Sequence, residues 1–174
     1  MALNAKKYAE AQVVLEQTLS THPLSKELFL LLNDVYSQRS KRACFEVIDK
    51  YKGSLLSSKD IVASRVLTAL DSWRESWEKQ NYALHQSMYS SDFKGGFKLR
   101  DSWEKDRQIK ISSPDYIKIS LEDVKLMVVS DEVISTTFTQ VYNSPNYQSR
   151  KQKNLIWLQK NDKWQIVSES SLGI

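Results

Sequence analysis

The sequence predicts an α+β protein in which helices come first and a curved antiparallel sheet follows. Up to about residue 111, apolar residues recur at three- and four-residue steps, as they do in amphipathic helices. After Pro114, short runs rich in β-branched and aromatic residues are separated by Asn, Ser, Pro and Asp, which is typical of strands joined by hairpins.

The composition indicates a folded chain and excludes several classes of site. A length of 174 residues suits one ordinary domain, or a domain of roughly 110 to 120 residues with a small appendage. The longest apolar run, Leu28 to Leu32, is far shorter than the ~18 residues of a membrane span. Cys44 is the only cysteine, which excludes an internal disulfide and a four-cysteine zinc site. We expect no metal and no cofactor.

The first 51 residues predict three helices. Tyr8, Ala11 and Leu15 form an apolar stripe, and Pro23 ends the helix that carries it. This spacing resembles the second half of a tetratricopeptide repeat. The next helices are expected at 24–36 and around Ala43, Val47 and Ile48.

The repeat resemblance implies a tetratricopeptide-like segment over residues 1–52 that binds a protein partner, because stacked repeats present a concave surface. It also implies that the chain starts inside a repeat array, so that the native N-terminus lies before Met1 and a signal peptide cannot be judged. The alternative is a plain helical hairpin that decorates the main domain.

Gly53 follows the last of these helices as a helix stop, and a second domain is expected over residues 57–174. Ser57 to Asp60 supply an N-cap for a helix of about twenty residues. A short helix is expected at 82–88, and a third at 97–111 with Leu99, Trp103 and Ile109. We expect three tryptophans to line the seam between the helices and the sheet: Trp73, Trp77 and Trp103.

Five strand segments are expected after Pro114, at 117–121, 124–128, 134–142, 153–158 and 163–169. Strand alternation places Phe138, Gln140 and Tyr142 on one face, which predicts a polar-tipped pocket. The opposite face of the same strand is compatible with a homodimer and consists of Ser135, Thr137, Thr139 and Val141.

A long helix, two short helices and a bent antiparallel sheet resemble the nuclear-transport-factor-two-like cone, shared with ketosteroid isomerases and SnoaL-type polyketide cyclases. A more specific run of residues resembles the cone domain at the C-terminus of L,D-transpeptidase-related bacterial envelope proteins, over roughly 57–170. It consists of Trp73, Trp77, Tyr82, Tyr89, Asp92, Phe93, Trp103, Phe138, Gln140, Tyr142, Ser144, Lys153, Leu155, Trp164, Ile166 and Glu169.

The resemblance implies an accessory domain in the bacterial periplasm or cell envelope. L,D-transpeptidases use a Cys nucleophile in a Ser-x-Gly-Cys setting, whereas Cys44 lies in Arg42-Ala43-Cys44-Phe45. We therefore do not expect transpeptidase chemistry from this chain.

The candidate catalytic residues are Asp92 and Tyr142. Asp92 would act as a general base, Tyr142 or Tyr89 would donate to a developing oxyanion, and Gln140 would orient the substrate. The alternative is that Asp92 caps the turn before Phe93, as Ser-Ser-Asp sequences usually do. The candidate ligand-binding residues are Tyr89, Gln140, Tyr142, Lys153 and Glu169.

Lys153 and Glu169 lie on late strands and are expected either to pair across the sheet or to contact a ligand. His22 and His85 lack the spacing of a metal or triad site. The basic residues of 94–110 and 150–163 are interrupted by acidic ones, so we expect a solvated face rather than a nucleic-acid surface.

The leading functional hypothesis is a non-catalytic binding or assembly module: helical repeats bind a protein partner, and the cone supplies a ligand pocket or a dimer face. One alternative is a small-molecule isomerase, cyclase or hydrolase that uses Asp92 and Tyr142. The other is recognition of cell-wall peptides or glycans by the aromatic pocket.

Overall fold

The computed structural model describes residues 2–21, 26–39 and 61–173, and it confirms the α+β class. The predicted helix around Ala43, together with Cys44 and His22, lies outside these described residues. In chain order the described elements are α1 (Ala2–Thr21), α2 (Lys26–Arg39), α4 (Ile61–Glu78), α5 (Tyr82–Ser87), α6 (Arg100–Ser112), β1 (Lys118–Ser130), β2 (Val133–Ser144), β3 (Tyr147–Lys160) and β4 (Lys163–Gly173).

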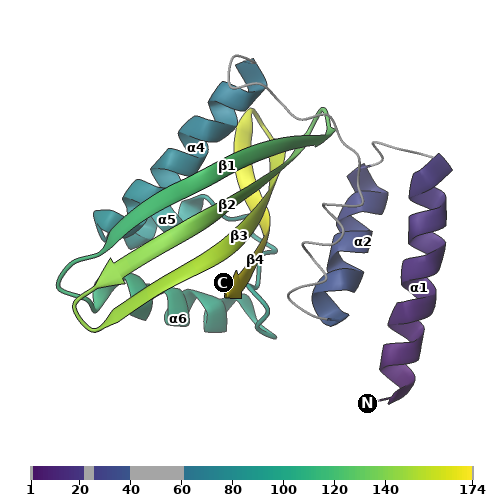
Figure 1. Ribbon diagram of the computed structural model, residues 1–174, viewed down its shortest axis with the longest axis horizontal. Coiled ribbons are helices and arrows are strands. Elements are labelled where there is room, and N and C mark those ends of the chain that lie inside the picture. Colours follow the sequence, from purple (N-terminus) through teal and green to yellow (C-terminus); the bar gives the residue numbers. More distant parts are fainter. Residues whose placement is uncertain (1, 22–25, 40–60, 174) are drawn as a thin grey trace.

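The four strands form one antiparallel sheet in the order β1-β2-β3-β4 (Figure 1). The two predicted segments at 117–121 and 124–128 are a single strand, so the expectation of five strands was wrong. Asp123 has a left-handed φ of 54°, at a bulge between Glu122 and Lys125. The extra residue returns Leu121 and Leu126 to the same face although their spacing is odd.

A second bulge in the pairing of β3 with β4 sets the position of Glu169. Ile166 pairs with Trp157, but the next partner along β3, Ile156, pairs with Ser168. One residue of β4 is therefore extra. Because of it, Ile166 and Glu169 both face the concave side of the sheet, whereas regular alternation would place them on opposite faces.

The main core lies between α4 and the concave face of the sheet. As predicted, Trp73, Trp77 and Trp103 line this seam, and none is more than 5% exposed. Trp73 packs edge-on against Phe138, with ring centroids 5.9 Å apart. The indole rings therefore fill the inside of the cone from the helical side.

Helix α6 begins at Arg100, three residues later than expected, because the backbone of Leu99 is extended, with φ −123° and ψ 146°. Gly95 and Gly96 have left-handed φ values in the loop before it. Leu99 and Ile109 are mostly exposed. The buried residues of this helix are Trp103 and Ile111, so its buried face runs through residue 107 between them.

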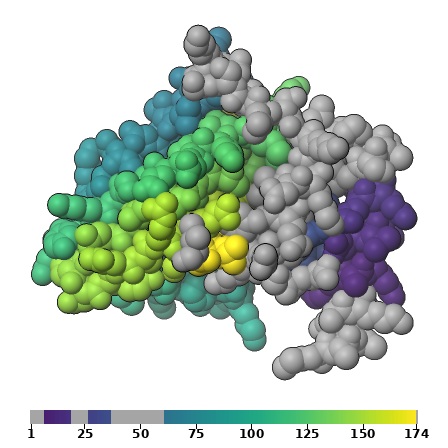
Figure 2. Space-filling model, in the orientation of Figure 1, coloured from purple at the N-terminus to yellow at the C-terminus, as the bar shows by residue number. Residues whose placement is uncertain are grey.

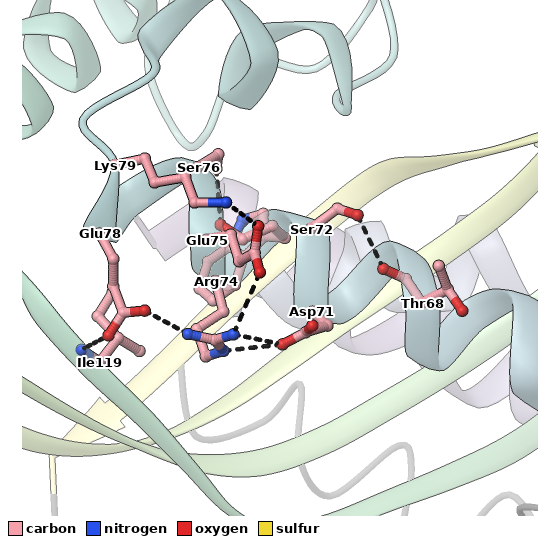
Figure 3. Close-up of polar contacts among 10 residues, drawn as sticks. Thr68, Asp71, Ser72, Arg74, Glu75, Ser76, Glu78, Lys79 and Ile119 are labelled. Atoms are coloured by element: carbon pink, nitrogen blue, oxygen red, sulfur yellow. Dashed lines mark hydrogen bonds and ion pairs between the residues drawn. The ribbon is translucent and has the colours of Figure 1, made fainter.

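The solvent-facing side of α4 is held by ion pairs along the helix (Figure 3). Arg74 bonds to Asp71 at 2.6 Å and pairs with Glu78. The other carboxylate oxygen of Glu78 accepts a bond of 2.9 Å from the backbone N–H of Ile119. Glu78 thus ties the end of α4 to the start of β1.

The N-terminal helices cover part of the convex face of the sheet, and α1 lies outermost (Figures 1 and 2). Phe29 of α2 is fully buried in a second core that includes Val129 and Ile156 of the sheet. Asn33 donates a bond of 2.9 Å to the hydroxyl of Ser168 in β4. Of the helices in the described ranges, none has the length and apolar character to span a membrane.

Candidate functional site

An open cavity of about 1550 Å³ lies between α6, the loop before it and the concave face of the sheet. Its inner wall combines aromatic rings with polar and charged groups. These residues include Trp77, Trp103, Arg107, Gln140, Tyr142, Lys153 and Glu169. The polar-tipped pocket predicted from the alternation of β2 is therefore present in the fold.

The floor of the cavity is built around a buried ion pair. Lys153 of β3 donates to Glu169 of β4, and the two side chains are 8% and 7% exposed. Lys153 also lies over the ring of Trp73, with its Nζ 5.3 Å from the ring centroid. The pairing across the sheet expected from the sequence is confirmed, and it occurs inside the cone.

Tyr89 forms a hydrogen bond with the second carboxylate oxygen of Glu169, on the side away from the cavity. Its hydroxyl donates to Glu169 Oε2 at 2.7 Å and accepts a bond of 2.8 Å from Trp73 Nε1. Backbone bonds of 2.9 and 2.8 Å between residues 88–90 and Ile166 fix Tyr89 against β4. Tyr89 is therefore part of the support for Glu169 and lies outside the cavity lining.

Arg107 completes the floor, and it was not among the site residues predicted from the sequence. Its Nη2 lies 3.3 Å from Glu169 Oε2, and its guanidinium lies between the rings of Trp77 and Trp103, 5.0 and 5.6 Å from their centroids. One signal was available: Arg107 lies four residues after a tryptophan and four before Ile111. An arginine in such a stripe faces the interior of a helix–sheet fold.

His85 lies deeper still, in contact with the aromatic wall. Ser76 Oγ donates to the carbonyl of Trp73 at 2.6 Å, so the 2.9 Å contact between Ser76 Oγ and His85 Nδ1 requires the imidazole to donate. The proton therefore lies on Nδ1. His85 Nε2 is buried and has no hydrogen-bond partner among the described residues.

The charges of this network are fixed by burial and pairing. Burial alone would raise the pKa of Glu169, but the positive charges of Lys153 and Arg107 outweigh it and hold that pKa well below its ordinary value. Burial, with the charge of Glu169, raises the pKa of Tyr89 well above the ordinary value. Burial and Arg107 keep the pKa of His85 well below its ordinary value.

The other predicted residues lie on the cavity wall or, in the case of Asp92, at its exposed mouth. Gln140 is 6% exposed and lines the inner wall. Tyr142 packs edge-on against Trp77, with centroids 6.0 Å apart. Asp92 is exposed at the mouth, and no described residue forms a hydrogen bond with its side chain. The structure therefore brings Tyr89, Lys153 and Glu169 together and leaves Asp92 apart from them.

Across residues 2–21, 26–39 and 61–173, no three His, Cys, Asp or Glu side chains are grouped so that they could hold a metal ion.

Comparison with solved structures shows the same fold in several bacterial proteins. Bd1075 from Bdellovibrio bacteriovorus is 24% identical with a TM-score of 0.59, over 64% of this chain and 40% of that one. The helical cell shape determining protein Pgp2 from Campylobacter jejuni is 23% identical with a TM-score of 0.53, over 63% and 40%. An NTF2-like protein of unknown function from Pseudomonas putida is 7% identical with a TM-score of 0.54, over 62% and 83%.

This chain thus spans less than half of the length of Bd1075 and of Pgp2. Among curated proteins, none matches it. The model of one family, the Cds6 C-terminal NTF2-like domain, matches residues 65–170, which is more than half of the chain. The chain therefore belongs to the Cds6 C-terminal NTF2-like domain family.

Proposed function

We propose that this chain is a non-catalytic binding module of the bacterial cell envelope whose cone cavity takes a ligand. The proposal rests on the ion pairing of Glu169, the acid on the cavity floor. Lys153, Arg107 and Tyr89 already occupy its oxygens. A general base is most effective when its pKa lies near the working pH, and the pKa of Glu169 lies well below that range.

The enzyme alternative rests on Asp92 and Tyr142, and the geometry gives it little support. Catalytic carboxylates usually gain their basicity from burial or from a neighbouring charge. Asp92 is exposed at the mouth of the cavity, where water solvates it. Should a substrate be found, unchanged turnover in Asp92→Asn would eliminate this residue as the base.

Two observations support a ligand from the cell wall. The cavity combines indole and phenol rings with the amide of Gln140 and charged groups, a mixture that suits peptides and sugars. A protein that shares the fold, Pgp2, is described as a helical cell shape determining protein. Fragments of the cell wall are therefore the ligands to test first.

Calorimetry with soluble muropeptides tests the proposal. The wild-type chain should release or absorb measurable heat, and Tyr142→Ala should weaken binding at least about tenfold, which corresponds to ~1.4 kcal/mol. Tyr116→Ala is the matched control, because Tyr116 is 44% exposed and lies outside the cavity lining. If the wild type gives no heat, the proposal of a cell-wall ligand is wrong. If both variants lose the same affinity, the ligand does not bind in the cavity.

We propose further that the N-terminal helices bind a protein partner. A shallow groove of about 450 Å³ between α1 and α2 is almost entirely apolar, and its walls include Val14 and Leu31, which are 60% and 52% exposed. The double variant Val14→Glu/Leu31→Glu should lose partners captured from a bacterial extract. Val62→Glu, a similar change at an exposed valine of α4, should retain them. Retention by the double variant would contradict the proposal.

A homodimer stays a prediction. Two of the four residues predicted for its contact face are buried in the single chain. Ser135 is only 2% exposed and Thr139 is 9% exposed, so neither is available to a second chain. The partly exposed residues of the predicted face are Thr137 and Val141. Light scattering at several concentrations tests the prediction, and a constant monomer mass would contradict it.

A further inference from the structure

The floor of the cone cavity carries one more positive charge than negative charge. Arg107 and Lys153 face a single carboxylate, Glu169, and the three side chains are 13%, 8% and 7% exposed. The two other titratable groups in contact with this network do not change the balance. Tyr89 is held in its neutral phenol form and His85 in its neutral imidazole form.

The remaining acids of the cavity are either exposed or already paired with a lysine, so they do not supply the missing negative charge at the floor. Asp34, Asp92 and Asp115 line the cavity but are exposed. Asp106, on α6, also lines the cavity and interacts with the charge of Arg107, but it is partly exposed and bonds at 2.8 Å to Lys110, a cation of the same cavity wall that balances its charge. Screening by water reduces what exposed charges contribute at the floor, while the buried charges keep most of their mutual interaction.

Arg107 also has unused donors. Its Nη2 meets Glu169, but its Nε is buried without an acceptor, and no described residue accepts from its Nη1. The rings of Trp77 and Trp103 hold the guanidinium plane in place. A planar fork with free donors is the group that proteins use to bind a carboxylate through two parallel bonds.

We propose that the ligand of this cavity presents a single carboxylate to Arg107, and that this carboxylate neutralises the excess charge of the floor. The inference rests on the proposed function, because it assumes that the cavity binds a ligand. One negative charge matches one excess positive charge. A phosphate monoester, with a charge of about −1.5 to −2, would leave the floor negative.

The test uses two probes that differ only in charge: N-acetyl-alanylalanine and its C-terminal amide. Binding to the full chain is followed by NMR through the indole N–H signals of Trp77 and Trp103, which line the cavity. The acid should bind at least tenfold more tightly than the amide. Arg107→Met should reduce this ratio to less than about twofold. Lys160→Met, which removes an exposed charge at the β3–β4 hairpin, should leave it unchanged.

A measurement on the wild type alone keeps the inference falsifiable if Arg107→Met does not fold. Acetate should raise the unfolding temperature more than the same concentration of acetamide, because a ligand that binds only the folded state stabilises it. Equal binding of acid and amide would overturn the carboxylate inference and leave the ligand pocket standing. Binding of neither probe by a protein that binds muropeptides, or tighter binding of inorganic phosphate, would overturn it as well.

Discussion

The stability of this protein should fall as the pH drops below about 6.5, because His85 cannot be protonated without disrupting the core. The imidazole is fully buried between the rings of Trp77 and Tyr89, whose centroids are 5.0 and 5.1 Å away. A second proton would go on Nε2, which has no acceptor among the described residues. Of the charges that act on it, Arg107 and Lys153 oppose protonation and only Glu169 favours it.

The size of the effect follows from linkage. The pKa of His85 in the folded state lies well below the ordinary value of about 6.5 that applies to the unfolded chain. Below that pH the unfolded state binds the proton and the folded state does not, so the free energy of unfolding falls with falling pH. At pH 5.5 the loss relative to pH 7.5 is on the order of 1 kcal/mol. Glu169 contributes in the same direction, but only below about pH 4.3.

Urea unfolding at pH 7.5 and 5.5 measures this loss. His85→Gln removes the titrating group and keeps a donor for Ser76, so its free energy of unfolding should change by less than half as much between the two pH values. Both proteins are best compared in a His22→Gln background, which removes the only other histidine of the chain. Parallel losses with and without His85 would refute the reasoning.

Three further substitutions, two of them with a matched control variant, test other parts of the structure by their free energies of unfolding. Gly95→Ala should lose ~3 kcal/mol, because an added Cβ would lie 2.2 Å from an indole carbon and φ is +57°, whereas Gly96→Ala meets no atom within 4 Å and should lose only ~1 kcal/mol. Equal losses would contradict the packing argument. Glu169→Gln should lose ~3–5 kcal/mol by leaving two buried cations unpaired, and Glu122→Gln, at an exposed pair, should show no measurable change. Phe29→Ala should lose ~3–5 kcal/mol, and a silent result would mean that α2 is not part of the core.

The sequence predicted the elements well where one periodicity ran without interruption. The long helix through Trp73 and Trp77 and the alternation of Phe138, Gln140 and Tyr142 both appear as expected. The prediction of elements failed where one extra residue interrupts the two-residue alternation of a strand. The bulge at Asp123 made one strand look like two, because period-two reasoning assumes that each residue pairs in turn.

Only some residues of the candidate site could be predicted from the sequence. Lys153 and Glu169 could be named as a pair because they carry opposite charges and lie on the last two predicted strands, which were expected to be neighbours. Arg107 was missed because its role depends on tertiary packing: the two indoles that enclose it come from different helices. The position of Glu169 also depends on the β4 bulge, which no local pattern of residues specified.

The two cores of the molecule share the sheet as a common wall, so the N-terminal helices and the cavity are linked through the same strands. On the convex side, Asn33 bonds to Ser168, the residue that precedes Glu169 in β4. The next residue of α2, Asp34, reaches the edge of the cavity. Deletion of residues 1–51 would therefore expose the apolar convex face and change the cavity at once. Because such a deletion cannot separate loss of a partner from loss of the fold, substitutions at exposed positions of the α1–α2 groove are the appropriate test of partner binding.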